Sequence, residues 1–228
     1  RFTPSCTNEL MAELGKIANE NKLPIQSHLS ENKGEVAWVK ELHPDCQEYW
    51  ETYDKYGLWN NKTLMAHCVH SSQREIDAMK KAGVYVVHCA SSNENLSSGY
   101  AHIKDMISQN VRVVLGSDIA GGDHVSMLDN VAATIRASKA RGIMDDYKTP
   151  FLTVEEAFYL GTSAANSFFD EVPGFAKGNE LHAIVLNDDE LPSVKELTIK
   201  ERFERAMYLR QKDAISAVYS VGRLVYTK

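Results

Sequence analysis

The chain repeats one pattern four times, and this repeat limits its fold more than any other feature of the sequence. Each repeat begins with a short apolar run rich in β-branched residues, reaches an ionisable residue near the end of the run, and continues into a helical pattern. The runs are residues 23–29, 63–69, 84–89 and 111–118, and the ionisable residues are His28, His67, His88 and Asp118. Near-continuous apolar strands are typical of a parallel sheet that helices cover. Because a (β/α)8 barrel of about 250 residues uses about 30 residues per unit, the repeat predicts an α/β fold of this class.

The ends of parallel strands meet at one edge of a sheet, so the four ionisable side chains should converge on one barrel mouth. Side chains alternate between the two faces of a strand, so the residue two positions earlier should share the inward face. This alternation places apolar or small residues below most of the ionisable ones, which is typical of an active site. The expected inward pairs are Gln26 with His28, Met65 with His67, Val86 with His88, and Val114 and Gly116 with Asp118.

Imidazole nitrogens and carboxylate oxygens are zinc ligands, and a catalytic zinc site keeps an open position for water. Glu31 follows His28 by three residues, so it is placed to move protons between that water and a substrate nitrogen. Other interpretations stay open. Asp118 could cap the turn at 119–122, and His88 is equally well interpreted as a packed structural residue.

Composition excludes several classes of function. Hydrophobic residues make up 43% of the 228 residues and charged residues 25%, as in ordinary globular proteins. A net charge of −6 without a basic run argues against nucleic acid as a partner. No apolar run approaches the ~20 residues that span a bilayer, so we expect no membrane insertion. The four cysteines contain no C-x-x-C pair, which favours a reduced, cytoplasmic setting.

Two further segments interrupt the repeat. Residues 45–61 are rich in aromatic side chains, and we interpret them as a helical cover on the core, on which nothing polar converges. After Pro173 the repeat is lost, and the sequence predicts strands at 181–186 and 218–226, the second broken by Gly222, with a charged helix at 199–209 between them. We therefore expect a barrel unit over residues 1–175, and part of a small β appendage with a C-terminal helix and strand over 176–228.

Several motifs together resemble the guanine deaminases, a family within the amidohydrolase superfamily. They are Gln26-Ser27-His28-Leu29-Ser30-Glu31-Asn32, Met65-Ala66-His67, His88-Cys89 followed by Ser92-Asn93 and Leu96-Ser97-Ser98-Gly99, and Leu115-Gly116-Ser117-Asp118-Ile119-Ala120-Gly121-Gly122. The opening Arg1-Phe2 and the run Ser126-Met127-Leu128-Asp129 support this family over its relatives. The similarity covers most of residues 1–180 and is less clear in the tail.

This resemblance implies a TIM-barrel amidohydrolase, here roughly strands 5–8 with their helices and part of a β-sandwich appendage. It implies that His28 and Asp118 ligate zinc, with iron(II) as the alternative metal, and that Asp118 belongs to the catalytic group. Glu31 would shuttle the proton and His67 would hold the hydroxide or the substrate. Arg1 and Phe2 would grip the purine, with His28, Glu31 and His67 also in contact with it. The implied reaction converts guanine to xanthine and ammonia, and the implied assembly is a homodimer of the complete protein.

One departure from the family is large. The H-x-H pair that this family carries on its first barrel strand has no counterpart here, and Arg1-Phe2 would correspond to the end of the fourth strand. We therefore expect the sequence to be the C-terminal portion of a longer protein. Two alternatives remain open: a deaminase or aminohydrolase for another purine, a pyrimidine or a triazine ring, and a non-catalytic barrel fragment that assembles with a partner.

Overall fold

The four predicted runs form one parallel sheet in the computed structural model, which describes residues 1–169, 174–189, 191–209 and 214–228. The strands are β1 (Ile25–Leu29), β2 (Thr63–His67), β3 (Tyr85–His88) and β4 (Arg112–Leu115), and they pair in this order. The predicted parallel α/β arrangement is therefore confirmed. That these strands are the fifth to eighth of a barrel stays a prediction.

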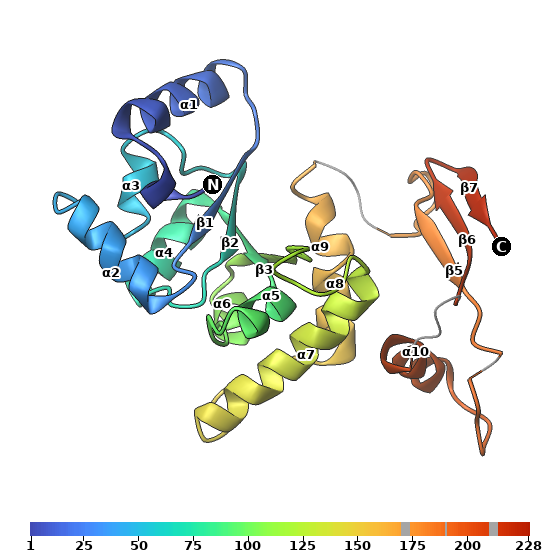
Figure 1. Cartoon of the computed structure of the whole chain (residues 1–228). Coiled ribbons are helices and arrows are strands. Elements are labelled where there is room, and N and C mark those ends of the chain that lie inside the picture. The colour runs from blue at the N-terminus through green and yellow to red at the C-terminus, as the bar shows by residue number, and fades with distance from the viewer. Residues whose placement is uncertain (170–173, 190, 210–213) are drawn as a thin grey trace. The chain divides into compact units, whose positions relative to one another are not determined.

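The sheet belongs to the first of two compact units, Arg1–Phe168 and Phe169–Lys228. The sequence places the boundary between residues 175 and 176, and this boundary stays a prediction. Figure 1 labels most of the helices and strands of both units, and each unit is described by itself.

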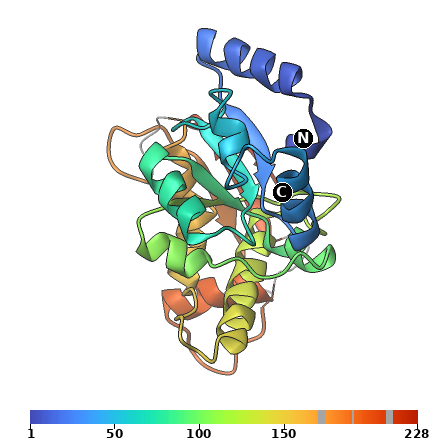
Figure 2. The ribbon, with the colours of Figure 1, turned by 90° about the vertical axis from the view of Figure 1, so that its left-hand side faces the viewer.

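Helices connect the strands of the first unit. A short 3-10 helix (Thr3–Ser5) and α1 (Asn8–Glu20) precede β1. The connections hold α2 (Lys33–Leu42), α3 (Glu51–Asp54), α4 (Gln73–Ala82), α5 (Ala90–Asn95) and α6 (Ile103–Ser108), and β4 is followed by α7 (Met127–Met144), α8 (Val154–Leu160) and α9 (Ser163–Asn166). In Figure 1, α2, α3 and α4 lie beside β1 and β2. Figure 2 shows α1, in dark blue, apart from the other helices of this unit.

The start of α2 fixes the backbone just after the motif at 26–32. The Asn32 side chain accepts a hydrogen bond from the backbone N–H of Glu35, and the Glu35 carboxylate accepts one in return from the N–H of Asn32. This capping box satisfies two backbone donors that the first turn leaves without partners. The strand–loop–helix junction that carries His28 and Glu31 is thereby held at its helical end. Within the described residues, no helix is both long enough and apolar enough to cross a bilayer.

The register of the sheet decides which side chains share a face. Ser27 pairs with Met65, Met65 with Val86, and Val86 with Val113, and all four are buried. His28 pairs with Ala66, so Ala66 and Leu64 share the face of His28 and Gln26. Val114 pairs with Val87 on that same face. The prediction that Met65 and Val86 point to the His28 side is therefore wrong, whereas the register agrees with the predictions for Gln26 and Val114.

The second unit contains an antiparallel sheet. Its strands are β5 (Ala183–Leu186), β6 (Ile215–Ser220) and β7 (Arg223–Thr227), paired in that order, and α10 (Ile199–Tyr208) lies between β5 and β6 in the chain. The single broken strand predicted over 218–226 is instead a hairpin. Val221 and Gly222 form its turn with positive φ angles of 49° and 72°, a conformation that glycine adopts without strain.

Candidate active site

The ends of β1 and β2 bring two histidines together. His28 Nδ1 lies 3.2 Å from His67 Nε2, and the ring centroids are 4.8 Å apart. By strict alternation His67 would share the face of Met65, away from His28. Its φ angle is +74°, outside the range of a strand, and the next residue, Cys68, has a φ of +50°. This left-handed turn ends the pleat, which explains how the His67 ring reaches the His28 side.

Glu31 lies against both histidines. Its Oε2 atom is 3.9 Å from His28 Nδ1 and 3.8 Å from His67 Nε2, and the residue is only 5% exposed. Its backbone N–H donates to Glu35 Oε2 at 2.8 Å, which fixes the main chain below the carboxylate. The contact with His28 lowers the pKa of Glu31 and outweighs the opposing effect of burial, and the electrostatic effects of the nearby His67 and Arg1 side chains lower it further. Glu31 is therefore a carboxylate at neutral pH and can accept a proton.

Asp118 approaches the same place from the loop after β4. Its Oδ2 atom lies 4.0 Å from His67 Nε2 and accepts a hydrogen bond from Ser92 Oγ at 2.6 Å. The loop is tight here: a Cβ atom on Gly121 would lie 2.6 Å from Ser92 Oγ and 2.8 Å from Asp118 Oδ2. Glycine at 121 therefore leaves room for the hydrogen bond that orients the carboxylate. The Asp118 side chain faces His67, as the ligand interpretation requires.

The first two residues complete the group. An Arg1 Nη atom lies 3.7 Å from Glu31 Oε2, and its guanidinium lies 5.2 Å from the centroid of the Phe2 ring. The Phe2 ring centroid is 6.4 Å from that of His28. The structure thus brings all six predicted site residues together: Arg1, Phe2, His28, Glu31, His67 and Asp118. Their chemical roles stay predictions.

The donor atoms fit a metal ion. One nitrogen or oxygen from each of His28, Glu31 and His67 lies within 4.8 Å of the others. Zinc–nitrogen bonds of about 2.0–2.1 Å in a tetrahedron place neighbouring ligand atoms roughly 3.3 Å apart. The His28–His67 separation of 3.2 Å matches this value, and the 4.0 Å from His67 Nε2 to Asp118 Oδ2 needs only a small closure. Of the two predicted ligands, His28 belongs to this set and Asp118 borders it.

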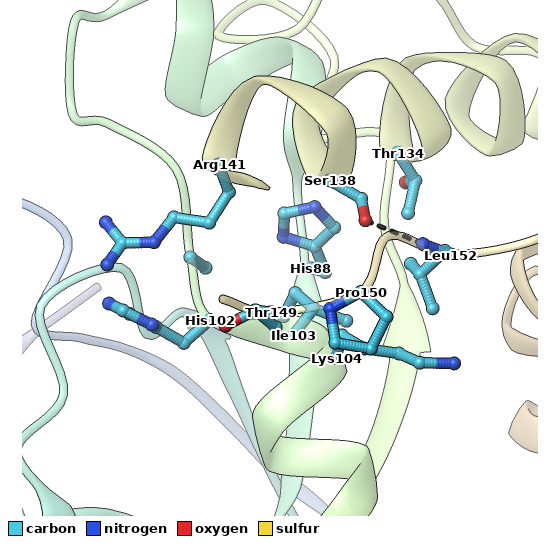
Figure 3. Close-up of a pocket in the computed structure, with 11 residues that line it drawn as sticks. His88, His102, Ile103, Lys104, Thr134, Ser138, Arg141, Thr149, Pro150 and Leu152 are labelled. Carbon is cyan, nitrogen blue, oxygen red and sulfur yellow. Dashed lines mark hydrogen bonds between the residues drawn. The ribbon is translucent and has the colours of Figure 1, made fainter. Parts of the chain in front are cut away.

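His88 lies elsewhere. It is in register with Leu115 and two residues after Val86, so it shares the face opposite His28. It is 3% exposed and lines a pocket with Thr134 and Ser138 of α7 and with the segment at 149–152 (Figure 3). Among the described residues, none gives His88 Nδ1 a hydrogen-bond partner. The structure places His88 in the packed core, so the expectation that all four strand-end residues converge is wrong for this one.

Burial of His88 has a measurable consequence for stability. Burial, with a smaller effect of the His67 charge, lowers its pKa from 6.5 to about 4. Between these values the unfolded chain binds a proton that the native ring does not, so stability falls as the pH falls from about 6.5 to about 4. The expected loss is on the order of 3 kcal/mol. Urea unfolding of wild type and His88→Leu at several pH values, followed by tryptophan fluorescence, should show a smaller acid loss in the variant.

The matched control is His182→Leu, because the His182 side chain is 48% exposed. Its acid loss should equal that of wild type. An equal loss in wild type and His88→Leu would contradict the assignment of the effect to His88.

Two tyrosines from the aromatic segment support the site. The Tyr53 hydroxyl donates to the backbone carbonyl of His28 at 2.6 Å, and the Tyr49 hydroxyl donates to Glu35 Oε1 at 2.7 Å. The prediction that nothing polar converges on this segment is wrong. The one available signal was the residue type, because a buried tyrosine needs a partner for its hydroxyl and a phenylalanine does not.

The segment after β3 supplies three more contacts. Ser92 donates to Asp118, Asn93 Oδ1 lies 2.9 Å from His67 Nδ1, and Ser98 Oγ lies 3.4 Å from Glu31 Oε1. All three residues are buried. The sequence motif contained them, but spacing alone gave them no role, since their partners are 26 to 67 residues away.

Known proteins resemble this chain in sequence and in fold. The Amidohydrolase family matches residues 1–198. Guanine deaminase from Dictyostelium discoideum is 36% identical over 232 residues, covering 99% of this chain and 51% of that protein. The solved guanine deaminase from C. acetobutylicum with guanine bound in the active site has a TM-score of 0.95 and 43% identity, covering 99% of this chain and 54% of that one.

A more distant structure, the zinc-bound adenosine deaminase from Xanthomonas campestris, has a TM-score of 0.82 at 19% identity, covering 96% of this chain and 48% of that one. It is similar in fold alone. The chain spans about half the length of the curated relatives that it matches.

Proposed function

Because the chain belongs to the amidohydrolase family, as its motifs predicted, we propose that it carries the zinc-dependent hydrolytic deamination of guanine to xanthine and ammonia. One observation carries the proposal: His28, Glu31, His67 and Asp118 meet beside Arg1 and Phe2, in a chain that is 43% identical to a guanine deaminase solved with guanine bound. We propose further that β1–β4 are the fifth to eighth strands of its barrel.

Each site residue has its own proposed chemical role. His28 and Asp118 would hold the metal, which we propose is zinc, with iron(II) as the alternative because both metals accept imidazole and carboxylate donors. A bound zinc ion lowers the pKa of a coordinated water to about 7, which makes hydroxide available at neutral pH. His67 presents Nε2 towards His28, Glu31 and Asp118, where it can hold the attacking oxygen or the substrate.

Glu31 would carry the protons. As a carboxylate it takes the proton that the attacking water releases when its oxygen bonds to the carbon bearing the amino group. It then delivers this proton to the adjacent ring nitrogen. The hydroxyl proton of the tetrahedral intermediate follows by the same carboxylate to the amine, the carbon–nitrogen bond breaks, and ammonia leaves. The neighbouring His28, His67 and Arg1 hold the pKa of Glu31 below its usual value against the effect of burial, so Glu31 returns to a carboxylate once it has given up the proton.

Arg1 and Phe2 would select the base. A guanidinium presents several N–H donors in a plane, which suits the carbonyl edge of guanine. A phenyl ring offers a flat apolar face to the flat base. Arg1 is 61% exposed at its side chain and lies against Glu31, so its donors border both solvent and the proposed proton carrier.

The full-length protein tests this function directly. Metal analysis should find zinc, and ultraviolet absorbance should follow guanine becoming xanthine with release of ammonia. Adenine, cytosine and an amino-triazine serve as competing substrates. Faster turnover of one of these compounds would make that compound, and not guanine, the proposed substrate. Absence of both metal and turnover would favour the non-catalytic fragment.

Arg1→Ala tests base selection. We expect kcat/KM for guanine to fall by about 10- to 100-fold, because a hydrogen bond from a charged group to the base is lost. Metal content should stay unchanged, since Arg1 is not a proposed ligand. Arg74→Ala is the matched control, because the Arg74 side chain is also 61% exposed and pairs with Glu48 away from the site. Equal effects of the two variants would contradict the role of Arg1.

A further inference from the structure

The two ring nitrogens of His67 face different surroundings. Nδ1 lies 2.9 Å from Asn93 Oδ1. Nε2 faces the candidate site, 3.2 Å from His28 Nδ1 and 3.8 Å from Glu31 Oε2. A neutral imidazole carries one hydrogen, on either nitrogen. The nitrogen that carries it decides whether His67 offers the site a lone pair or an N–H donor.

We propose that Asn93 is a positioning residue that holds His67 as the Nδ1–H tautomer. The amide oxygen of Asn93 can only accept, so the hydrogen bond requires the hydrogen to be on Nδ1. The lone pair of His67 is then on Nε2 and points at His28, Glu31 and Asp118. The catalytic consequence of this inference rests on the proposed function. The assignment of the tautomer does not depend on that function.

The surroundings of Asn93 and His67 favour a stable hydrogen bond between the two side chains. Asn93 and His67 are each 1% exposed, so water does not compete for their hydrogen bond. The Asn93 backbone is anchored on both sides: its N–H donates to Cys89 O at 2.9 Å and its carbonyl accepts from Ser98 N at 2.8 Å. The amide is therefore presented from a fixed main chain. His67 itself stands where β2 has left its regular pleat, and Asn93 contacts the ring nitrogen that faces away from His28.

The tautomer matters to the chemistry. With the lone pair on Nε2, His67 can accept a hydrogen bond from the attacking water or from a substrate N–H, or donate electrons to a metal ion. With the hydrogen on Nε2, the ring would offer a donor at the same point and could do none of these. Changes to residues that orient a ligand through its second nitrogen typically cost about 10- to 100-fold in metal affinity or activity.

Nuclear magnetic resonance of the protein labelled with ¹⁵N-histidine tests the tautomer without turnover. His67→Gln assigns the His67 signals by their disappearance. In wild type, the ¹⁵N shifts should show a protonated Nδ1 and an unprotonated Nε2. A protonated Nε2 would overturn the proposal, because it would mean that the Asn93 amide is turned round and donates through Nδ2, for which the described residues offer no other partner.

Two variants link the tautomer to activity. Asn93→Leu removes the acceptor and should mix the two tautomers in the spectrum, with kcat for guanine lowered by about 10- to 100-fold and a smaller change in KM. Asn93→Asp keeps an acceptor and should restore the Nδ1–H spectrum and most of kcat. Failure of Asn93→Asp to restore either would overturn the proposal.

Asn130→Leu is the control for the general cost of losing a buried asparagine. Asn130 is 2% exposed and its amide bonds to the backbone carbonyls of His124 and Ser126. This variant should leave the His67 signals unchanged. If wild type turns over no guanine but shows the Nδ1–H tautomer, the proposed function fails and the role of Asn93 stands.

Discussion

Replacing Glu31 with glutamine should lower kcat for guanine deamination by about 10²- to 10⁴-fold, the range that general acid–base groups contribute. The amide has nearly the same shape but cannot take a proton from the attacking water. Glu31 lies 3.8–3.9 Å from both histidines and is a carboxylate at neutral pH, so its replacement removes the buried carboxylate that can take up this proton. Stopped-flow or steady-state absorbance at saturating guanine measures the effect.

Two further measurements separate proton transfer from other roles of Glu31. Metal content should remain at the wild-type level, because His28 and Asp118 are the proposed ligands. A parallel loss of metal in Glu31→Gln would make Glu31 a ligand and contradict its role as proton carrier. Glu41→Gln, the same substitution at an exposed position of α2, should leave kcat unchanged.

His28→Ala should abolish both metal binding and turnover. A residue that only orients a ligand is worth about 10- to 100-fold, so loss of a ligand should cost more than about 100-fold in activity. Metal analysis after gel filtration should give a stoichiometry well below that of wild type. The His28 ring contacts Phe2, Glu31 and His67, so its removal also opens the centre of the site.

Added zinc distinguishes weak binding from a different role. If His28 is a ligand, a large excess of zinc should restore part of the metal content of His28→Ala. His124→Ala is the control, because the His124 side chain is 47% exposed and faces Asp123 and Asp129 instead. Full metal content in His28→Ala would remove His28 from the ligand set.

Much of the first unit could be predicted from the sequence because its signals are local. A β-branched run followed by a helical pattern predicts a parallel strand and its covering helix from neighbouring residues alone. His28, Glu31 and Asp118 then follow, since each stands at the end of such a run or just after it. Asn32 and Glu35 likewise have the spacing of a capping box, which marks the start of α2.

The failures have different physical origins. A strand buried on both faces is apolar throughout, so periodicity cannot tell which face is which. Val86 and His88 were therefore assigned to the wrong face, and Met65 was misplaced because His67 leaves the pleat at a left-handed residue. Tyr53 and Asn93 were missed as partners because their contacts to His28 and His67 span 25 and 26 residues. Such contacts exist only once the strands have been ordered.

The left-handed backbone at His67 also bears on redesign of the site. Most side chains are strained at a φ of +74°, whereas glycine tolerates it, and asparagine, aspartate and histidine adopt positive φ several-fold more often than other residues. A substitution at position 67 must therefore meet two conditions: its side chain must supply the required chemistry, and its backbone must adopt this φ. Glutamine or lysine would keep a polar group there but would be less suited to this backbone than histidine. Asparagine is the substitution that separates the two demands, because it suits the same backbone as histidine while removing the imidazole.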